Sequence, residues 1–228
     1  MANWQKIRRL GETITILPDK AVFLSDRKTL LVSDIHLGKG QAFRARQFFA
    51  PPGLCAGDLD RLLRLIIDCG ASRLIVLGDL VHSRDGIDRE LDELFIAFRE
   101  KTKDVEISLV LGNHDRKVKF SKQWQLNLLS GYFEEGGFVF DHGDSPLPQA
   151  LLTAKKFAFS GHIHPAVKLS GAGLSERLPC YWLRQKERRL VLPSFGTFTG
   201  AFTIKPESAD RIFIPLYNEG SVVEVNLN

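Results

Sequence analysis

Five short apolar runs, each ending in residues that can carry chemistry, constrain this chain more than any other feature. They span residues 30–34, 74–79, 109–113, 138–142 and 157–162. Runs of this length that are rich in Val, Ile, Leu and Phe predict buried strands. The polar residues that end each run are therefore expected at the ends of strands.

Helical patterns lie between the first three runs. One follows Asp58, an expected N-cap, and stops at Gly70. A second follows Asp88. The apolar positions that recur at helical spacing are Leu59, Leu62, Leu63, Ile66 and Ile67 in the first pattern, and Leu91, Leu94, Phe95 and Phe98 in the second. Alternation of strand and helix predicts parallel strands with helices packed outside them, and functional groups gather at the carboxyl ends of such strands.

The predicted secondary structure changes after Pro165 from alternating strands and helices to strands alone. Residues 179–183, 190–192 and 222–225 predict strands with no helix between them. We expect this C-terminal third to form a β-meander that completes a second sheet. No linker rich in Pro, Gly or Ser interrupts the chain, so residues 1–228 are expected to form a single α/β domain.

Composition excludes several classes of protein. A content of 44% hydrophobic and 25% charged residues is ordinary for a globular domain, and no run approaches the ~20 apolar residues of a membrane span. The N-terminus lacks the apolar core of a secretory signal. Three widely spaced cysteines disfavour a disulfide framework or a thiolate zinc site, so a cytoplasmic location is expected. The net charge of +4 leans mildly toward polyanionic partners.

All six histidines of the chain lie at or just after the end of a predicted strand, next to Asp34, Asp79 and Asn113. A single histidine is more often structural than a ligand, but six gathered in this way disfavour that interpretation. Imidazole and carboxylate groups bind Mn, Fe, Co or Zn. The donors exceed what one tetrahedral ion uses, which indicates two ions. Two ions about 3.5–4 Å apart are a standard device for phosphoester hydrolysis.

Five motifs in order make the sequence resemble the calcineurin-like metallophosphoesterases. The motifs are Asp34-Ile35-His36, Gly78-Asp79-Leu80-Val81-His82, Gly112-Asn113-His114-Asp115, His142, and Gly161-His162-Ile163-His164. The resemblance implies a four-layer α/β/β/α sandwich of two mixed β-sheets flanked by helices. It also implies an enzyme, a metal-dependent phosphoesterase.

The same resemblance implies a role for each residue of the motifs. Asp34, His36 and His164 would hold one metal ion. Asn113, His142 and His162 would hold the other, and Asp79 would bridge both. His114 resembles the catalytic histidine that stabilises the phosphoryl oxygens or protonates the leaving group. His82 stands where phosphatases of the family often carry Asp, as in some DNA nucleases of the superfamily, which favours a phosphodiester substrate.

Segments outside these motifs resemble a bacterial subgroup, the ligase-associated DNA-damage-response endonucleases (PdeM). They are residues 34–39 with Phe43 and Arg44, residues 178–182, and residues 192–200. This likeness implies Mn²⁺ as the pair of ions (Fe, Co or Zn being alternatives), a nucleic acid substrate in DNA repair, and association with a DNA ligase or helicase. Asp144, just after His142, departs from the subgroup and would add a carboxylate near the second ion.

Basic residues that follow the ligand motifs are candidates to hold substrate phosphates: Lys39, Arg44 and Arg116, with Arg46 and Lys117 beside them. Solvated surface charge is the equally good alternative for each. Two other functions stay open at this point. The enzyme could act on small nucleotides, pyrophosphate-linked molecules or phosphoproteins, and the chain could be a non-catalytic scaffold of the same fold.

Overall fold

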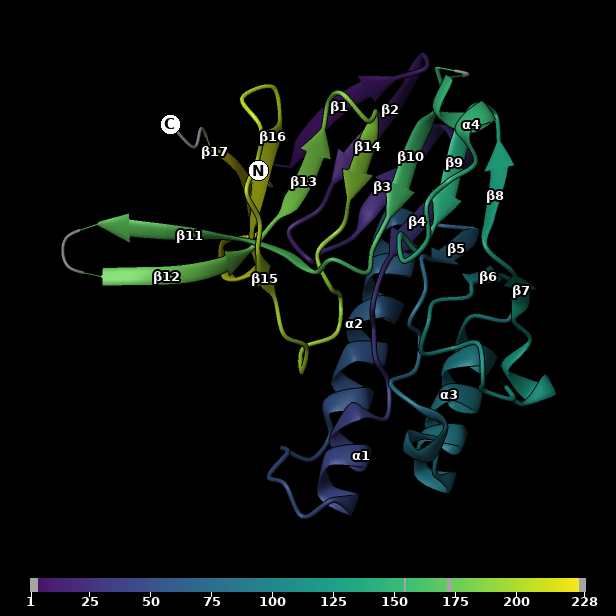
Figure 1. Cartoon of the computed structure of the whole chain (residues 1–228). Coiled ribbons are helices and arrows are strands. Elements are labelled where there is room, and N and C mark those ends of the chain that lie inside the picture. The colour runs from purple at the N-terminus through teal and green to yellow at the C-terminus, as the bar shows by residue number, and fades with distance from the viewer. Residues whose placement is uncertain (1–3, 154, 172–173, 226–228) are drawn as a thin grey trace.

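Two seven-stranded sheets lie face to face in the computed structural model, which describes residues 4–153, 155–171 and 174–225 (Figure 1). The first sheet follows the order of the chain. Its strands run antiparallel from β1 to β4 and parallel from β4 to β7. They are β1 (Gln5–Arg9), β2 (Glu12–Ile16), β3 (Val22–Leu24), β4 (Thr29–Val32), β5 (Arg73–Val76), β6 (Glu106–Val110) and β7 (Asn127–Leu129).

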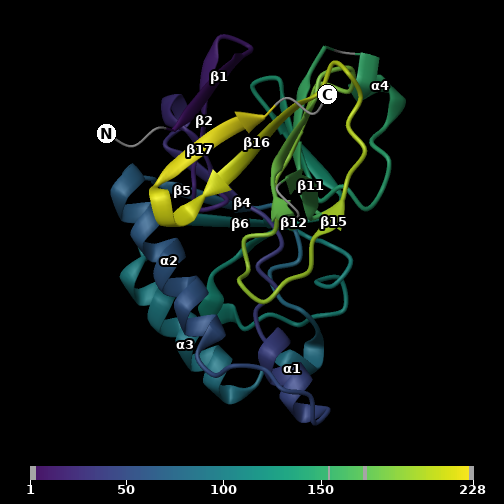
Figure 2. The same ribbon diagram turned by 90° about the vertical axis from the view of Figure 1, so that its left-hand side faces the viewer.

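Helices α2 (Leu54–Cys69) and α3 (Arg89–Lys101) lie side by side on the outer face of the first sheet, and α1 (Lys39–Ala45) lies beyond them (Figure 2). Leu62 and Ile66 of α2 and Phe95 of α3 share one buried cluster with Leu30 of β4. Trp124 completes this cluster, because its ring stacks on that of Phe95 with 4.0 Å between centroids. The parallel strands and outer helices predicted from the sequence are confirmed.

The ends of these helices test the predicted caps. The Asp88 carboxylate accepts a hydrogen bond from Leu91 N at 2.8 Å and caps α3, and Gly70 ends α2 with a φ of 60°. The prediction that Asp58 caps α2 is wrong, because the N-cap is Gly53, five residues earlier. Gly53 starts the helix from a left-handed conformation with a φ of 74°, and Asp58 lies buried within it.

The second sheet contains the C-terminal strands, as predicted. Its order is β17-β16-β13-β14-β10-β9-β8, with β9, β10 and β14 parallel and the other pairs antiparallel. The strands are β8 (Tyr132–Glu135), β9 (Phe138–Asp141), β10 (Phe157–Ser160), β13 (Tyr181–Arg184), β14 (Arg189–Val191), β16 (Arg211–Leu216) and β17 (Ser221–Val225).

The largest apolar core lies between the two sheets. Ile14 and Ile75 of the first sheet pack in one cluster with Phe138, Phe159 and Tyr181 of the second. The Tyr181 hydroxyl is also buried and donates to backbone oxygens of the β2–β3 turn at 2.6 and 2.9 Å, so the polar atom is satisfied. This interface fixes how the carboxyl ends of the two sheets face each other.

The outer face of the second sheet is covered in two ways. The short helix α4 (Gln149–Thr153) places Leu151 against Val139 and Ala158. A separate three-stranded sheet contributes the second cover: β11 (Pro165–Gly171), β12 (Leu174–Pro179) and β15 (Phe202–Thr203). Val167 of β11 packs in one buried cluster with Trp182 and Ile212 of the second sheet. The mixed α/β sandwich predicted from the sequence is therefore confirmed, and the third sheet is an addition to it. The β11–β12 hairpin projects to one side of the molecule (Figure 1).

Short 3₁₀ helices complete the described part of the fold: η1 (Ser25–Arg27), η2 (Arg84–Gly86), η3 (Lys122–Trp124) and η4 (Tyr217–Glu219). Among the residues that the structure describes, no helix combines the length and apolarity that a membrane crossing requires.

Candidate metal and catalytic site

The nine histidine, aspartate and asparagine residues singled out in the sequence converge where the two sheets meet. The loops after β4, β5 and β6 supply the residues of the first sheet, and the loops after β9 and β10 supply those of the second. The carboxyl ends of parallel strands share one edge of a sheet, so the topology brings these loops together. They carry Asp34, His36, Asp79, His82, Asn113, His114, His142, His162 and His164.

The backbone at this edge is strained. Five of the nine residues have φ values between 48° and 65°, a left-handed region that residues other than glycine rarely adopt: Asp34, His36, Asp79, His162 and His164. Each such residue costs about 1–3 kcal/mol and is typically found at functional sites. Loop-to-loop hydrogen bonds hold the strained backbone, with Asp34 N donating to Gly78 O at 3.1 Å and His36 N to Asp79 O at 2.9 Å.

Gly78 is required where the two sheets approach each other. Its φ is +83°, and a Cβ atom built on it would overlap the imidazole of His142. The ring of His142 fills the space left by the missing side chain, and its Nδ1 donates to Leu77 O at 2.8 Å. Glycine at this position therefore lets a second-sheet histidine reach the first-sheet ligands.

One donor group contains Asp34, His36 and His164. The Nε2 atoms of the two histidines are 3.4 Å apart, and His164 Nε2 lies 3.0 Å from Asp34 Oδ1. That contact lacks hydrogen-bonding geometry, so Asp34 Oδ1 is buried without a hydrogen-bond partner among the described residues. A buried carboxylate oxygen facing two imidazole nitrogens is suited to a divalent cation.

A second donor group contains Asp79, His142 and His162, with Asn113 beside it. His142 Nε2 lies 3.4 Å from Asp79 Oδ2, 3.1 Å from Asn113 Oδ1 and 3.2 Å from His162 Nδ1. Because Nδ1 of the same ring donates to a backbone oxygen, the Nε2 lone pair of the neutral ring points into this group.

Asp79 occupies the middle of the cluster. Its Oδ2 lies 3.4 Å from His142 Nε2, 3.8 Å from His36 Nε2 and 3.9 Å from His114 Nε2, and its Oδ1 accepts from His114 N at 3.0 Å. Burial by itself raises the pKa of this carboxyl, but the hydrogen bond and charge of His142 lower it to about 2. Asp79 is therefore an ionised carboxylate that faces both donor groups.

The charge states of the rings follow from burial. Burial lowers the pKa of His36 to about 3, and burial with the neighbouring His114 lowers the pKa of His82 to about 4. Both rings are neutral near pH 7, which is the form that binds a metal. Burial also lowers the pKa of His142, but the hydrogen bond to Asp79 and the nearby carboxylates raise it to about 9. A cation bound to that ring would have to displace its proton.

His82 and His114 lie against the first donor group and stack on each other, with ring centroids 5.2 Å apart and planes at 25°. Nδ1 of His114 hydrogen-bonds the backbone oxygen of His82, so it acts as the donor. The ring nitrogen left over, Nε2, faces Asp79. With His36 these two rings form a third group whose nitrogen atoms lie within 4.8 Å of one another.

Two supporting groups were not singled out from the sequence. Asp115, the last residue of the Gly-Asn-His-Asp motif, is buried and accepts from Gly112 N at 3.0 Å and from Val81 N at 3.3 Å. Burial raises the pKa of this carboxyl to about 6. Ser194 Oγ donates to Asp34 O at 2.7 Å, and Gly196 N donates to the same oxygen at 3.2 Å. The motif itself signalled Asp115, whereas Ser194 lies 160 residues from its partner.

The structure separates the three candidate phosphate-binding residues. Lys39 lies at the N-terminal end of α1, half-buried, with its charge close enough to lower the pKa of His82. Arg44 is exposed and donates to Pro51 O at 3.0 Å, so its guanidinium holds the loop after α1. Arg116 pairs with Asp144 at 2.5 Å on the rim beside His162. Of the three, Lys39 alone has neither a side-chain hydrogen bond nor an ion pair among the residues that the structure describes.

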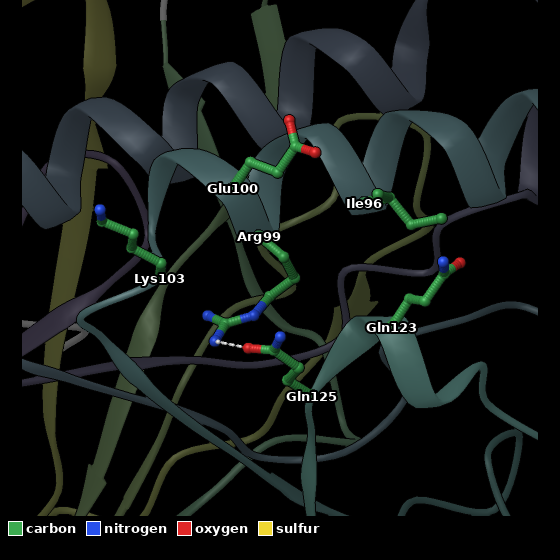
Figure 3. A pocket seen from close by; sticks show the side chains of 6 residues that line it. All are labelled: Ile96, Arg99, Glu100, Lys103, Gln123 and Gln125. Atoms are coloured by element: carbon green, nitrogen blue, oxygen red, sulfur yellow. Dashed lines mark hydrogen bonds between the residues drawn. The ribbon is translucent and has the colours of Figure 1, made fainter.

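A hollow of about 380 Å³ lies elsewhere on the molecule, and none of the nine cluster residues lines it. Figure 3 shows its lining on α3 and around η3, where Arg99 donates to Gln125 Oε1 at 3.2 Å. Arg99 also donates to the backbone oxygens of Thr102 and Val105. The guanidinium in this hollow is therefore a structural group that closes the end of α3.

The cluster fits divalent metal ions by its chemistry. It offers imidazole nitrogens and carboxylate oxygens in three groups, each with ligand atoms within 4.8 Å of one another. The thiols of Cys55, Cys69 and Cys180 contribute to none of these groups. Such a donor set suits Mn, Fe, Co or Zn and disfavours a structural thiolate site.

The fold and this donor set define a metal-dependent phosphoesterase, and the family model described as "Calcineurin-like phosphoesterase" matches residues 27–167. The chain therefore belongs to the calcineurin-like phosphoesterase family, whose members are hydrolases acting on phosphoester bonds with divalent metals.

Solved structures give a closer comparison. The chain is similar to the nuclease MPE of Pseudomonas putida, with 30% identity and a TM-score of 0.80 over 93% of this chain and 97% of that one. A protein of unknown function from Aquifex aeolicus, AQ665, matches at 18% identity and a TM-score of 0.39 over 60% of this chain and 78% of that one. No curated protein matches the sequence significantly.

Proposed function

We propose that this protein is a metal-dependent nuclease that hydrolyses phosphodiester bonds in DNA. The observation that carries the proposal is the position of Asp79, whose Oδ2 faces a donor group from each sheet and also His114. An ionised carboxylate that faces a donor group on either side suits a bridging ligand for two cations. The likeness to nuclease MPE supports nucleic acid as the substrate.

We assign Asp34, His36 and His164 to one ion, and Asn113, His142 and His162 to the other, with Asp79 shared. When bound, the two ions would lower the pKa of a bound water and neutralise charge on the phosphoryl oxygens. The imidazole and carboxylate donors suit Mn, Fe, Co or Zn, and the likeness to the ligase-associated subgroup favours Mn²⁺ among them.

His114 is the proposed catalytic acid. Its Nδ1–H is held by the His82 backbone oxygen, which fixes the plane of the ring and aims Nε2 at the cluster. In the protonated ring, the Nε2 proton is the one positioned for the departing oxygen of the substrate. His82, stacked on His114 and neutral, contacts the reacting phosphate from the side of α1.

Lys39 is the proposed phosphate ligand among the basic residues. It lies three residues after His36 in the chain, and its ammonium group has no carboxylate partner among the described residues. Arg116 could bind a substrate phosphate only if the substrate displaced Asp144 from it. Arg44 could do so only if the substrate displaced the backbone oxygen of Pro51. Lys39→Ala is therefore expected to weaken substrate binding more than Arg44→Ala does.

A role in DNA repair and association with a DNA ligase or helicase remain proposals that rest on the likeness of residues 34–44, 178–182 and 192–200 to the ligase-associated subgroup. Co-purification of this protein with the ligase and helicase of its own cell would test them. Recovery of neither enzyme at near-stoichiometric level would remove this part of the proposal.

An activity screen tests the enzymatic part. Chelator-treated protein is supplied separately with Mn²⁺, Zn²⁺, Mg²⁺, Fe²⁺ or Co²⁺ and given single-stranded DNA, plasmid DNA, RNA and cyclic nucleotides. We expect cleavage of DNA, strongest with Mn²⁺, and none in the presence of chelator. Hydrolysis confined to small nucleotides would replace the nuclease by a small-molecule phosphoesterase, and inactivity with every metal would revive a scaffold role.

A further inference from the structure

A pocket lies beside the cluster of candidate ligands, and two segments far apart in the sequence form its walls. Helix α1 and the loop before β15 line this open pocket of about 270 Å³. Its walls are Lys39, Phe43, Thr197, Phe198, Thr199 and Gly200. The rings of Phe43 and Phe198 stand edge to face, with centroids 5.5 Å apart and planes at 83°.

The pocket adjoins the candidate reaction centre on two sides. The ring of Phe43 lies 6.3 Å from that of His82, measured between centroids. On the other side, His164 Nδ1 donates to Gly200 O at 3.0 Å. A group stacked on Phe43 or Phe198 would therefore lie about one nucleotide unit from a phosphate held at the cluster.

The wall that carries Phe198 is held rigidly. The buried Asp58 carboxylate accepts from Thr197 N at 3.1 Å and from Thr197 Oγ1 at 2.6 Å. Thr199 Oγ1 donates to Gly196 O at 2.7 Å, so the turn on either side of Phe198 is closed. A side chain that is fixed before binding loses little conformational entropy when a ligand stacks on it.

The charge of the pocket favours an anionic ligand with a flat apolar part. Lys39 Nζ lies 6.0 Å from the centroids of both Phe43 and Phe198, and the six lining residues include no acid. The aromatic surface continues past Phe43 onto Phe48, whose ring centroid is 6.0 Å away and whose side chain is exposed. Aromatic platforms next to cations are the usual way in which proteins hold unpaired bases.

We propose that Phe43 and Phe198 form a stacking subsite for the base of a nucleotide that flanks the scissile phosphate, with Lys39 on the adjoining phosphate. This inference rests on the proposed nuclease function and adds the residues that position the strand. The base would stack on an aromatic face and make no hydrogen bond that reads its identity, so the subsite accepts any of the four bases.

Substrates with a missing base test the subsite directly. A single-stranded oligonucleotide with one cleavable linkage and phosphorothioates elsewhere is compared with versions that lack one base at each flanking position. For the wild-type protein with Mn²⁺, one abasic position is expected to lower kcat/KM by about 5- to 150-fold, the range for loss of one stacked base.

Substitutions of Phe198 show whether its ring is the surface on which that base stacks. Phe198→Leu is expected to cut the intact strand as slowly as the wild type cuts the abasic one, and to show no further loss on the abasic strand. Phe198→Tyr keeps an aromatic face and should keep the wild-type pattern. Tyr217→Leu, at an exposed aromatic residue on η4 outside this pocket, serves as the matched control and should behave as wild type.

Two results would overturn the inference while leaving the nuclease function in place. In one, Phe198→Leu and Phe43→Leu cut the intact strand at the wild-type rate. In the other, the kcat/KM of both variants falls by the same factor on the intact and the abasic strand, as expected if the two rings are only structural. If the wild-type protein cuts no oligonucleotide with any metal, the subsite and the proposed function both fall.

Discussion

Replacement of Gly78 by alanine tests how much stability and metal affinity depend on the close contact between Gly78 and His142. Gly78 has a φ of +83°, and an added Cβ would overlap the ring of His142. Gly11, in the turn between β1 and β2, has the same φ of +83°, but a Cβ there meets nothing within 4 Å. Gly11→Ala is therefore a matched control, because it loses only the stability that a left-handed backbone costs alanine.

The magnitudes follow from these contacts. Both variants place alanine in the left-handed region at a cost of about 1–2 kcal/mol. Only Gly78→Ala must also displace the buried His142 ring, and overpacking of a buried site costs about 1–3 kcal/mol. For a chain of this size 1 kcal/mol shifts Tm by about 2–4 °C. Gly78→Ala should therefore melt about 2–12 °C below Gly11→Ala.

Metal binding gives a second readout of the same perturbation. Movement of His142 disturbs its bond to Leu77 O, and loss of such a supporting contact lowers metal affinity by about 10- to 100-fold. Thermal unfolding by circular dichroism and calorimetric titration with Mn²⁺ would measure both effects. Equal Tm values for the two alanine variants, or equal Mn²⁺ affinities, would refute the argument that His142 needs glycine at position 78.

Other substitutions separate metal binding, chemistry and stability. Asp79→Asn should lower Mn²⁺ stoichiometry and turnover together, because its carboxylate faces both donor groups; full occupancy with full activity would contradict the bridge. His114→Ala should keep its metal but lose about 10²–10⁴-fold in turnover, the usual contribution of an acid catalyst, so an active variant would refute the assignment. At the seam between the sheets, hydrogen bonds and charge from Arg73 and Arg27 hold the pKa of Glu135 below its usual 4.5. The folded carboxylate binds its proton more weakly than the unfolded one, so this stability is fully present above the unfolded pKa of 4.5 and is lost as pH falls through the lower pKa of the folded protein. Urea unfolding should show Glu135→Gln less stable than wild type by about 0.2–1 kcal/mol near pH 7, with a difference that shrinks as pH falls below 4.5; a difference independent of pH would rule out the ion pairs as its cause.

Local patterns were enough to predict several elements. The apolar runs became β4, β5, β6, β9 and β10, since each is a buried strand whose core contacts need only apolar side chains in a row. Asp88 and Gly70 were placed correctly at helix ends because a cap depends on the few residues next to it.

The third sheet and the true role of Asp58 escaped prediction. β11 pairs with β12 on one side and with β15, more than 30 residues further along, on the other, and nothing in the sequence of these strands indicates the pairing with β15. Asp58 looked like a cap because of its type, but it accepts hydrogen bonds from Thr197, which is 139 residues away. Long-range partners of this kind leave no periodic signal in the sequence.

The chemistry of the cluster follows from residue types alone, because ligand type is a property of each side chain and the strands that carry them are local structures. Three facts came from the folded chain: Asp79 faces donors from both sheets, Arg44 and Arg116 are occupied elsewhere, and Phe43 meets Phe198. Those facts depend on how two twisted sheets and their loops pack against each other. Packing is set by contacts between residues far apart in the chain, which spacing along the chain does not encode.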